Sequence, residues 1–379
     1  MRIAYIANST IPSRAANSIH VMKQCQALRQ LGHDVELIAR RPAPGGETIE
    51  QDALWHRYGV RDPFPLRLLR PTRRLYRTAY AVRAVARARR SGAELVWTRN
   101  YLAAPLAAWL GIPTLYEAHG LQDDRPRRLA YRTLWRSGRR HRFATITEAL
   151  ARDFRRAFPE LADAPILVLP DGVDLERFTD LPEPADARRL LGWPDRPTLG
   201  YAGHLYPGRG VDLLLEIAAD LPGWSVSLMG GTEADIDRYR ELVRDRGLTS
   251  MHVRGFIPNA ELPLHLAACE ALAMPHQRVV RAADGGDIAA WTSPMKMFEY
   301  LATGRLVLAS DLPVLREVLT DENAVLLPSE HPEAWRAALH AAAADPAAAR
   351  SRGAQGRRDV QRYSWRERAE RALARMREG

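Results

Sequence analysis

The sequence SPMKMFEYLATGRLVLAS at residues 293–310 is typical of a short helix that leads into a buried strand. We expect Ser293 to cap this helix and Pro294 to occupy its first position. The backbone amides of Met295 and Lys296 would then lie unpaired at the positive end of the helix dipole. Such an end attracts anions, so the stretch favours a site for a diphosphate.

Glu299 extends this interpretation. It follows Pro294 by five residues, which corresponds to about 7.5 Å along a helix axis. A carboxylate at that distance from a bound phosphate is suited to accept hydrogen bonds from the hydroxyls of a ribose. The sequence therefore predicts a nucleotide-diphosphate site. The alternative is an ordinary capped helix with a solvated glutamate.

Length and composition favour a two-domain protein with sizeable cores, since the chain has 379 residues of which 46% are hydrophobic. Cys25 and Cys269 form no disulfide framework and are typical of a reducing compartment. No apolar run approaches the roughly 18 to 20 residues that span a membrane. The chain also begins directly with a strand pattern, so we expect a cytoplasmic protein without a signal peptide.

Short strand-like runs alternate with helical periodicity along the whole chain, which is typical of parallel strands buried on both faces. We place the boundary between two doubly wound halves within residues 170–184. Ligands of such sheets bind at the carboxyl ends of the strands. The predicted strands are residues 2–7, 34–40, 94–99, 114–119, 143–147, 166–169, 198–203, 224–229, 251–255, 271–274, 306–310 and 324–327.

Four sequences, taken in this order, resemble a known family. The chain looks like a GT-B glycosyltransferase of family 4, a large group of retaining nucleotide-sugar transferases, over essentially its whole length. The four are residues 7–21 with ANSTIP and SIHV, residues 116–120 (YEAHG), residues 203–210 (GHLYPGRG) and residues 293–304.

The resemblance implies an α/β fold of the GT-B type, with two Rossmann-like, doubly wound domains facing across a cleft. Residues 1–175 would form the N-terminal, acceptor-side domain and residues 176–362 the domain that binds the nucleotide sugar. The helix at residues 363–379 would pack back on the first domain. The implied activity is retaining sugar transfer from a nucleotide-diphosphate donor to a hydroxyl acceptor, without a cofactor.

The sequence after Gly203 resembles the family's phosphate clamp, in which an arginine and a lysine neutralise the leaving group. His204 stands at the arginine position and Arg209 at the lysine position. Arg209 keeps a phosphate-binding head, whereas His204 is charged only if its pKa is raised. The alternative is that Gly208, Arg209 and Gly210 form only a loop that starts a helix.

Resemblance also implies roles for His119 and Glu299. His119, at a strand end, would contact the transferred sugar and position the transition state without abstracting a proton. Glu299 matches the second glutamate of the family's motif, but Trp291 stands where the first would be. Asp287, in the preceding loop, is a candidate substitute, and a solvated loop is the alternative.

The first loop offers candidate acceptor or phosphate contacts in Arg14, Asn17 and Ser18. Many relatives have two glycines here, whereas this chain does not. Ser18 would cap the following helix and donate to a ligand. The alternative is a capped helix with a solvated arginine.

The nucleotide base would lie near the strand at residues 251–255, where Arg254 and Phe256 are candidates. We expect a UDP-sugar donor, with GDP- and ADP-sugars as alternatives. No metal is expected, since the pair Asp235 and Asp237 falls early in a helix, where acidic residues are favourable in any case.

The net charge is +10, almost all of it from arginine. Residues 65–90 interleave arginine with leucine and tyrosine, which suits peripheral contact with the inner face of an anionic membrane. The alternative is a helix packed on its own domain. The resemblance to the family implies a sugar or lipid-linked acceptor. We expect no nucleic-acid partner, since aromatic residues are not interleaved with cations on a sheet face.

Two other classes of function stay open. A nucleotide-sugar epimerase on the same fold would convert its substrate without an acceptor. A catalytically weakened partner protein would bind nucleotide and transfer nothing, and the residues His204 and Trp291 make this class plausible.

Overall fold

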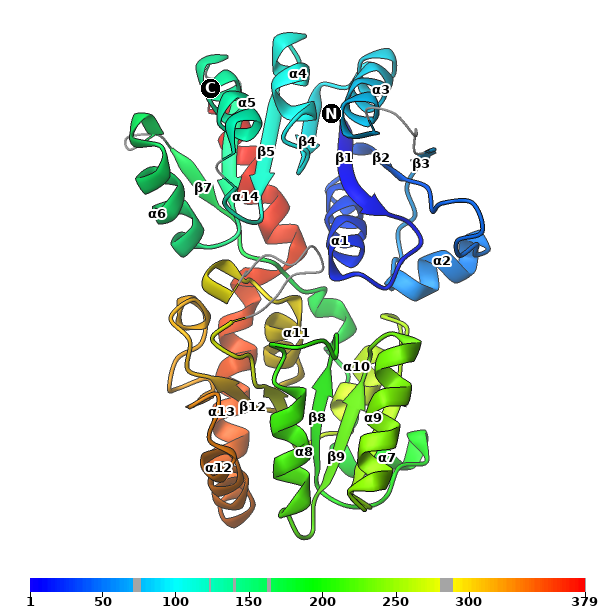
Figure 1. Cartoon of the computed structure of the whole chain (residues 1–379), viewed down its shortest axis with the longest axis vertical. Helices are drawn as coiled ribbons and strands as arrows, with labels where there is room; N and C mark the ends of the chain where they lie inside the picture. Colours follow the sequence, from blue (N-terminus) through cyan, green and yellow to red (C-terminus); the bar gives the residue numbers. More distant parts are fainter. Residues whose placement is uncertain (71–75, 123, 139–140, 162–164, 280–288, 379) are drawn as a thin grey trace. The chain divides into compact units, whose positions relative to one another are not determined.

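The computed structural model of the chain describes residues 1–378 except 71–75, 123, 139–140, 162–164 and 280–288. Contacts between residues divide the chain into two compact units. Unit 1 comprises Met1–Asp171 together with Trp365–Gly379, and unit 2 comprises Gly172–Ser364. Each unit is built on its own parallel sheet with helices between successive strands (Figure 1).

Unit 1 contains a seven-stranded sheet in the order β3-β2-β1-β4-β5-β6-β7, in which every described pairing is parallel. Its strands are β1 (Arg2–Thr10), β2 (Asp34–Arg40), β3 (Leu66–Leu69), β4 (Leu95–Thr98), β5 (Thr114–Ala118), β6 (His141–Thr145) and β7 (Ile166–Val168). Its α-helices are α1 (Ala16–Gln30), α2 (Gln51–Tyr58), α3 (Tyr76–Arg90), α4 (Ala103–Trp109), α5 (Arg125–Arg136), α6 (Glu148–Ala157) and α14 (Trp365–Arg377).

Both faces of this sheet are covered, which explains why residues 3–7 of β1 are all apolar or aromatic. Ala4 and Ile6 belong to a core that also contains Tyr80 and Ala84 of α3. Tyr5 lies on the other face, where its ring stacks on that of Trp97 at 5.9 Å between centroids. Successive strand residues point to opposite faces, so a strand buried on both cannot alternate with polar residues.

Unit 2 contains a six-stranded sheet in the order β10-β9-β8-β11-β12-β13, in which every described pairing is also parallel. Its strands are β8 (Thr198–Ala202), β9 (Ser225–Met229), β10 (Met251–Gly255), β11 (Ala271–Met274), β12 (Leu306–Ser310) and β13 (Val325–Leu327). Its α-helices are α7 (Pro184–Leu191), α8 (Val211–Ala219), α9 (Glu233–Asp245), α10 (Leu262–Ala267), α11 (Met295–Thr303), α12 (Pro332–Ala344) and α13 (Pro346–Asp359). These two sheets confirm the predicted doubly wound halves.

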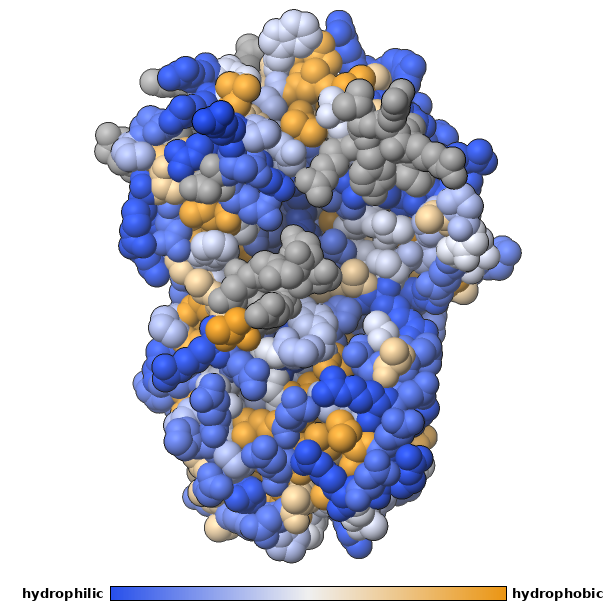
Figure 2. All heavy atoms as spheres, viewed as in Figure 1, coloured by the Kyte–Doolittle hydropathy of each residue, from blue (hydrophilic) through white to orange (hydrophobic). Residues whose placement is uncertain are grey.

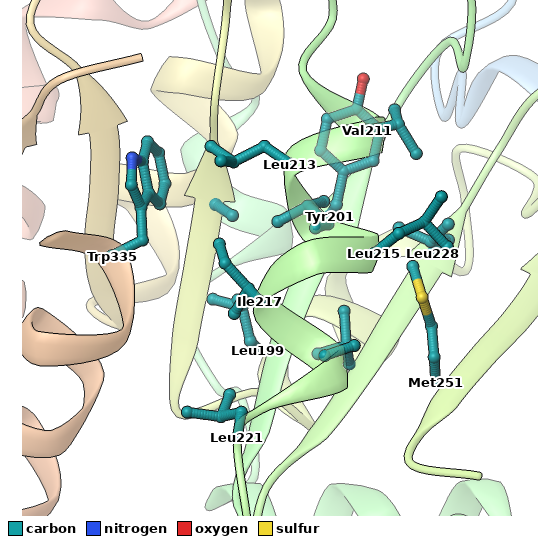
Figure 3. Close-up of a cluster of buried hydrophobic side chains, with 14 of the residues drawn as sticks. Leu199, Tyr201, Val211, Leu213, Leu215, Ile217, Leu221, Leu228, Met251 and Trp335 are labelled. Atoms are coloured by element: carbon teal, nitrogen blue, oxygen red, sulfur yellow. The ribbon is translucent and has the colours of Figure 1, made fainter. Parts of the chain in front are cut away.

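The main core of unit 2 lies between its sheet and α8 and α12 (Figure 3). Leu199 and Tyr201 of β8 pack there with Ile217 of α8 and Trp335 of α12. The residue between them, Gly200, faces the opposite side, where an added Cβ would lie 2.4 Å from the Cys269 sulfur. The core therefore fixes β8, and with it the loop that follows its carboxyl end.

The predicted strands agree with the structure to within two residues at each end, except that β1 continues to Thr10, three residues past its predicted end, and that β3 is absent from the prediction. It lies inside the arginine-rich segment 65–90, which we considered as a single membrane-contacting or packed helical stretch. The described residues of that segment instead form an edge strand and α3. Arg67 of β3 is exposed because the strand is paired only with β2 on one side, so its sequence lacks a continuous apolar run.

Two predicted helix starts are also wrong by a short distance. α11 begins at Met295 with Pro294 as its N-cap residue, so Ser293 does not cap it. α1 begins at Ala16 with Ala15 as its N-cap residue, so Ser18 lies inside the first turn. Helix ends are set by backbone geometry and tertiary packing, and a capping residue nearby does not locate them to the residue.

The described part of the chain contains no helix that is long and apolar enough to cross a membrane. On the face drawn in Figure 2, hydrophilic residues predominate and hydrophobic atoms form small patches, one of them over α4. The most exposed large apolar side chains include Trp109 at 78% and Leu129 at 69%.

Gly210, at the N-terminus of α8, should be far less replaceable than Gly192, at the C-terminus of α7. Both have a left-handed backbone, with φ of +73° and +65°. An added Cβ at Gly210 would lie 1.7 Å from the Pro275 carbonyl oxygen, whereas nothing lies within 4 Å at Gly192. We expect Gly192→Ala to cost about 1–2 kcal/mol and Gly210→Ala to cost at least about 2 kcal/mol more. Thermal unfolding compares the two variants, and equal losses would contradict this.

Candidate functional site

The backbones that follow the carboxyl ends of β8 and β9 contact each other directly at two glycines. Gly203, directly after β8, has φ of +137°, and its amide donates to the Met229 carbonyl at 2.8 Å. An added Cβ on Gly230, after β9, would lie 2.1 Å from the Gly203 carbonyl oxygen. No larger residue fits this crossing, so the edge of the sheet presents backbone instead of side chains.

Arg209 lies in the loop between β8 and α8, and two aromatic residues hold it. Its Nη1 lies 2.8 Å from Nε2 of His276, which follows β11 and is completely buried. Its Nη2 donates to the Tyr206 hydroxyl, and its guanidinium carbon lies 4.8 Å above the Tyr206 ring. No carboxylate within the described residues forms an ion pair with Arg209, so its charge is available to an anion from outside the chain.

His204 contributes no positive charge to this region. Burial lowers its pKa to about 4, and the nearby Arg209 and Lys296 add to this effect. The ring is therefore neutral near pH 7. Of the two residues that the sequence suggested as a phosphate clamp, His204 and Arg209, only Arg209 supplies a positive charge in this loop.

The helix α11 is attached to the end of β8 by Tyr300. The Ala202 amide donates to the Tyr300 hydroxyl at 2.7 Å, and that hydroxyl lies 3.3 Å from the Ala202 carbonyl. This pair of contacts attaches α11 to the end of β8, and the side chain of Lys296, in the first turn of α11, lies beside Gly203. The structure thus brings together two segments that are about 90 residues apart in sequence.

Glu299, in the second turn of α11, is held by a short relay of polar groups. Asn259, after β10, donates from Nδ2 to Glu299 Oε1 at 3.3 Å. Arg177 donates from Nη1 to the Asn259 side-chain oxygen at 2.7 Å. This relay holds the carboxylate in place, and carboxylate oxygens are acceptors suited to ligand hydroxyl groups.

Lys296 projects its amine onto the same sheet edge. Its Nζ lies 3.8 Å from the centre of the Tyr201 ring, and an added Cβ on Gly203 would lie 2.7 Å from it. Gly203, His204, Arg209, Met295, Lys296 and Glu299 therefore form one region of unit 2, which we call the sheet-edge site.

The other predicted site residues of unit 2 are not part of the sheet-edge site. Arg254 stacks its guanidinium on the Trp193 ring, 4.2 Å from the centroid. One face of the guanidinium therefore already contacts Trp193 and cannot also stack on a nucleotide base. Phe256 is half-buried directly after β10, and Ser293 is buried just before α11. Asp287 lies outside the described residues.

In unit 1, His119 follows β5 and bonds to a buried carboxylate. Its Nε2 contacts Glu117 Oε1, two residues earlier on the same face of the strand. Burial lowers the pKa of His119 to about 3, with Arg99 adding to the effect, so the ring is neutral near pH 7. With Nε2 donating to the carboxylate, Nδ1 is left as an acceptor for a hydroxyl group.

Glu117 is completely buried and is shared between several partners. Arg368 of α14 lies 2.9 Å from Oε2, and the indole nitrogen of Trp97 donates to the same oxygen at 3.0 Å. His20 of α1 lies 3.1 Å from Oε1, with its other ring nitrogen 3.0 Å from Asp171. Burial alone would raise the pKa of Glu117, but Arg368 and His20 hold it well below its ordinary value.

His20, Glu117 and His119 place ligand-type atoms within 4.8 Å of one another, as in a metal site. However, Arg368 already supplies a positive charge to the same carboxylate, which disfavours a second cation there. Asp235 and Asp237 do not form a metal site either, because Asp235 completes a capping box at the start of α9 and Asp237 is exposed.

The first loop uses some of its polar groups internally. Ser18 is completely buried, and its hydroxyl donates to the backbone carbonyls of Ser13 and Ala15 at 3.2 and 2.6 Å. Asn17 is exposed and Arg14 is half-exposed, so these two side chains are the accessible ones at the start of α1.

Sequence reasoning missed four residues that support these side chains. They are His276 beside Arg209, Asn259 beside Glu299, and the pair Glu117 and Arg368 beside His119. One signal was available, because Glu117 and His119 are two residues apart on a predicted strand and must share a face. The others come from distant elements, and only the fold places them.

Comparison with known families matches both parts of the chain. Residues 18–177 match the family model described as "Glycosyltransferase Family 4", and residues 196–345 match the one described as "Glycosyl transferases group 1". Together the two matches include most of both units.

One curated relative is a D-inositol 3-phosphate glycosyltransferase from Kineococcus radiotolerans, 28% identical over 233 residues. The match covers 55% of this chain and about half (51%) of that relative. Among solved structures, a sucrose-phosphate synthase from Thermosynechococcus elongatus has a TM-score of 0.72 at 21% identity, covering 100% of this chain and 98% of that one. Anabaena HepE in complex with UDP-glucose has a TM-score of 0.74 at 16% identity, covering 99% of each chain. These likenesses establish the GT-B fold.

Arg368→Met should destabilise unit 1 strongly, because it leaves Glu117 buried without its cation. We expect a loss of about 3–5 kcal/mol near pH 7, measured by denaturant unfolding. Since the pKa of Glu117 is held low, this contribution is present above about pH 4.3 and is lost as the pH falls further. Arg366→Met, which removes an exposed ion pair to Glu370 on the same helix, is the control and should cost less than about 0.5 kcal/mol. Similar losses in both variants would contradict this account.

Proposed function

Because this chain belongs to glycosyltransferase family 4, we propose that it transfers a sugar from a nucleotide-diphosphate donor to a hydroxyl acceptor with retention of the anomeric configuration. We assign the donor nucleotide to unit 2 and the acceptor side to unit 1. The observation that carries the proposal is the sheet-edge site, where Arg209 lies near the amine of Lys296, which comes from the first turn of α11.

In this proposal the diphosphate binds at the first turn of α11, where the amides of Met295 and Lys296 and the helix dipole favour an anion. Arg209 stabilises the charge that develops on the leaving phosphate. Glu299 accepts the ribose hydroxyls. His276 and Asn259 act as positioning residues, since each holds one of these side chains in place.

The transfer breaks the bond between the anomeric carbon and the phosphate oxygen and forms a bond to the acceptor oxygen on the same face of the sugar. The acceptor's proton passes to the departing phosphate, which leaves as the nucleoside diphosphate. No protein carboxylate is needed as a nucleophile, and the charge is carried by cations and amides instead of a metal. The transition state resembles an oxocarbenium ion.

His119 would contact the transferred sugar through its free Nδ1. A neutral ring is suited to hydrogen bonding with a sugar hydroxyl, and it is a poor proton acceptor because its pKa is low. Glu117 keeps the ring in one tautomer and orientation.

The donor that we propose is a UDP-sugar. This is supported by the GT-B fold shared with HepE, whose structures contain UDP and UDP-glucose. For the acceptor we propose a sugar or lipid-linked hydroxyl compound, and the name of the inositol phosphate glycosyltransferase supports a phosphorylated polyol as a further candidate.

Thermal unfolding in EDTA with UDP, GDP, ADP or dTDP tests the donor site directly. A nucleotide at about 100 times its dissociation constant should add roughly 2.7 kcal/mol to the stability. We expect UDP to stabilise the wild type, and Arg209→Met and Glu299→Gln to reduce this effect and to lower transfer about 100-fold. Arg238→Met, on an exposed turn of α9, is the control.

The assay product, examined by NMR, should retain the donor's anomeric configuration. An inverted product would overturn the mechanism, and conversion of the nucleotide sugar without an acceptor would favour an epimerase. Nucleotide binding without any turnover would favour a weakened partner protein, and full activity in both variants would show that the site is assigned wrongly.

We also propose that α3, with α4 beside it, contacts an anionic membrane surface. Tyr80, Ala84 and Val85 of α3 are buried, whereas Val82 is 50% exposed and Arg83 is exposed beside it. The largely exposed Trp109 of α4 adds an amphipathic ring of the kind found at membrane interfaces. This combination of cations with exposed apolar groups suits the headgroup region of a bilayer.

The double variant Arg83→Glu with Trp109→Ser should reduce cosedimentation with vesicles that contain anionic phosphatidylglycerol. Each cation near such a surface contributes about 1 kcal/mol, so replacing one by an anion should weaken binding at least tenfold. Arg238→Glu in unit 2 should have little effect. If the double variant binds as tightly as the wild type, this surface is not the contact.

A further inference from the structure

Lysine is rare in this chain, and its two copies differ in their surroundings. Lys23 of α1 donates from Nζ to the Gly59 carbonyl at 2.6 Å. Lys296 has a buried Nζ that finds no hydrogen-bond partner among the residues that the structure describes. A buried amine without an acceptor is unfavourable, so its retention at this position calls for an explanation.

Most of the groups around the Lys296 amine carry a positive charge or no charge. Arg209 is close enough to lower the pKa of Lys296 further, after the larger effect of burial, and only Glu299 opposes this. His204 and His276 are neutral near pH 7, because burial and these same cations lower the pKa of each. Tyr201 lies beneath the amine and contributes a ring face. The region therefore lacks a negative charge that balances both Lys296 and Arg209.

The amine also occupies a particular place in the fold. It approaches Gly203, where even one added methyl group would lie 2.7 Å from Nζ. The next residue is His204, which stands where the resemblance to the family places an arginine. Lys296 reaches this place from α11, a different element of unit 2.

We propose that the side chain of Lys296 supplies the second phosphate-binding cation of the donor site, in place of the arginine that His204 replaces. This inference rests on the proposed function and adds to it, because the α11 backbone alone offers partial charges only. Arg209 and Lys296 would then neutralise the diphosphate from two elements, the β8–α8 loop and the first turn of α11.

A consequence is that nucleotide binding and protonation are coupled. A bound diphosphate supplies the missing negative charge, so the pKa of Lys296 must be higher in the complex than in the free protein. Affinity is then full below the pKa of the free protein and falls as the pH rises from there to the pKa of the complex. Arginine at this position would stay charged and remove the effect.

Binding of UDP, uridine and pyrophosphate by Lys296→Met tests the proposal, with isothermal titration as the measurement. We expect UDP and pyrophosphate to bind at least tenfold more weakly than to the wild type, whereas uridine should bind equally well. Adding His204→Arg to Lys296→Met should recover much of the loss, because it returns a cation to the loop. Arg238→Met is the control for a lost surface charge.

The pH dependence gives a readout that a purely structural lysine would not affect. Between about pH 7.5 and 9.5, where the phosphate is already fully ionised, UDP affinity should fall with rising pH in the wild type and stay level in Lys296→Arg. His204 and His276 titrate well below this range, and burial raises the pKa of Tyr201 above it.

The outcomes separate this inference from the function on which it rests. Wild-type UDP affinity in Lys296→Met, with binding lost in Arg209→Met, would overturn the role of Lys296 and leave the proposed function standing. Equal losses for uridine and UDP in Lys296→Met would also overturn it, since they indicate a collapsed site. Failure of the wild type to bind any of the four nucleoside diphosphates or pyrophosphate would overturn both.

Discussion

The buried ion pair between Arg368 and Glu117 is the contact on which the organisation of unit 1 depends. Glu117 lies in the centre of a sheet, where an unpaired carboxylate would be highly unfavourable, and the compensating cation comes from the last helix of the chain. The same carboxylate orients His119 and faces His20. A structural requirement, the neutralisation of one buried charge, thus also defines the position of a candidate catalytic ring.

In the function that we propose, unit 2 must bring an anion-binding helix end close to the edge of a sheet. Glycine makes this possible at Gly203 and Gly230, where backbone meets backbone, and Tyr300 attaches α11 to β8 at that point. The cations are then added from separate elements. Such a site is largely formed before any ligand arrives, which reduces the entropy lost on binding.

Sequence patterns predicted the buried parts of the fold well and its edges less well. The runs at β8 and β12 are apolar because both of their faces are covered, so their sequences alone identify them. β3 is short, lies at the sheet edge and exposes Arg67, so no such run exists there. The backbone amides of α11 and the residue Arg209 could be proposed from motifs. The direction of the Lys296 side chain and the partners His276 and Arg368 depend on contacts between distant elements, which local patterns do not contain.

Unit 1 is formed by two separate stretches of the chain, and this affects how it can fold during synthesis on the ribosome. Its sheet is translated first, but α14, which carries Arg368, emerges only after all of unit 2 has been made. Until then Glu117 lacks the Arg368 cation, and the surface of α1 that packs against α14 has no cover. Unit 2 is continuous in sequence and has its contacts available as soon as it leaves the exit tunnel. The half that is synthesised first is therefore the last to be completed.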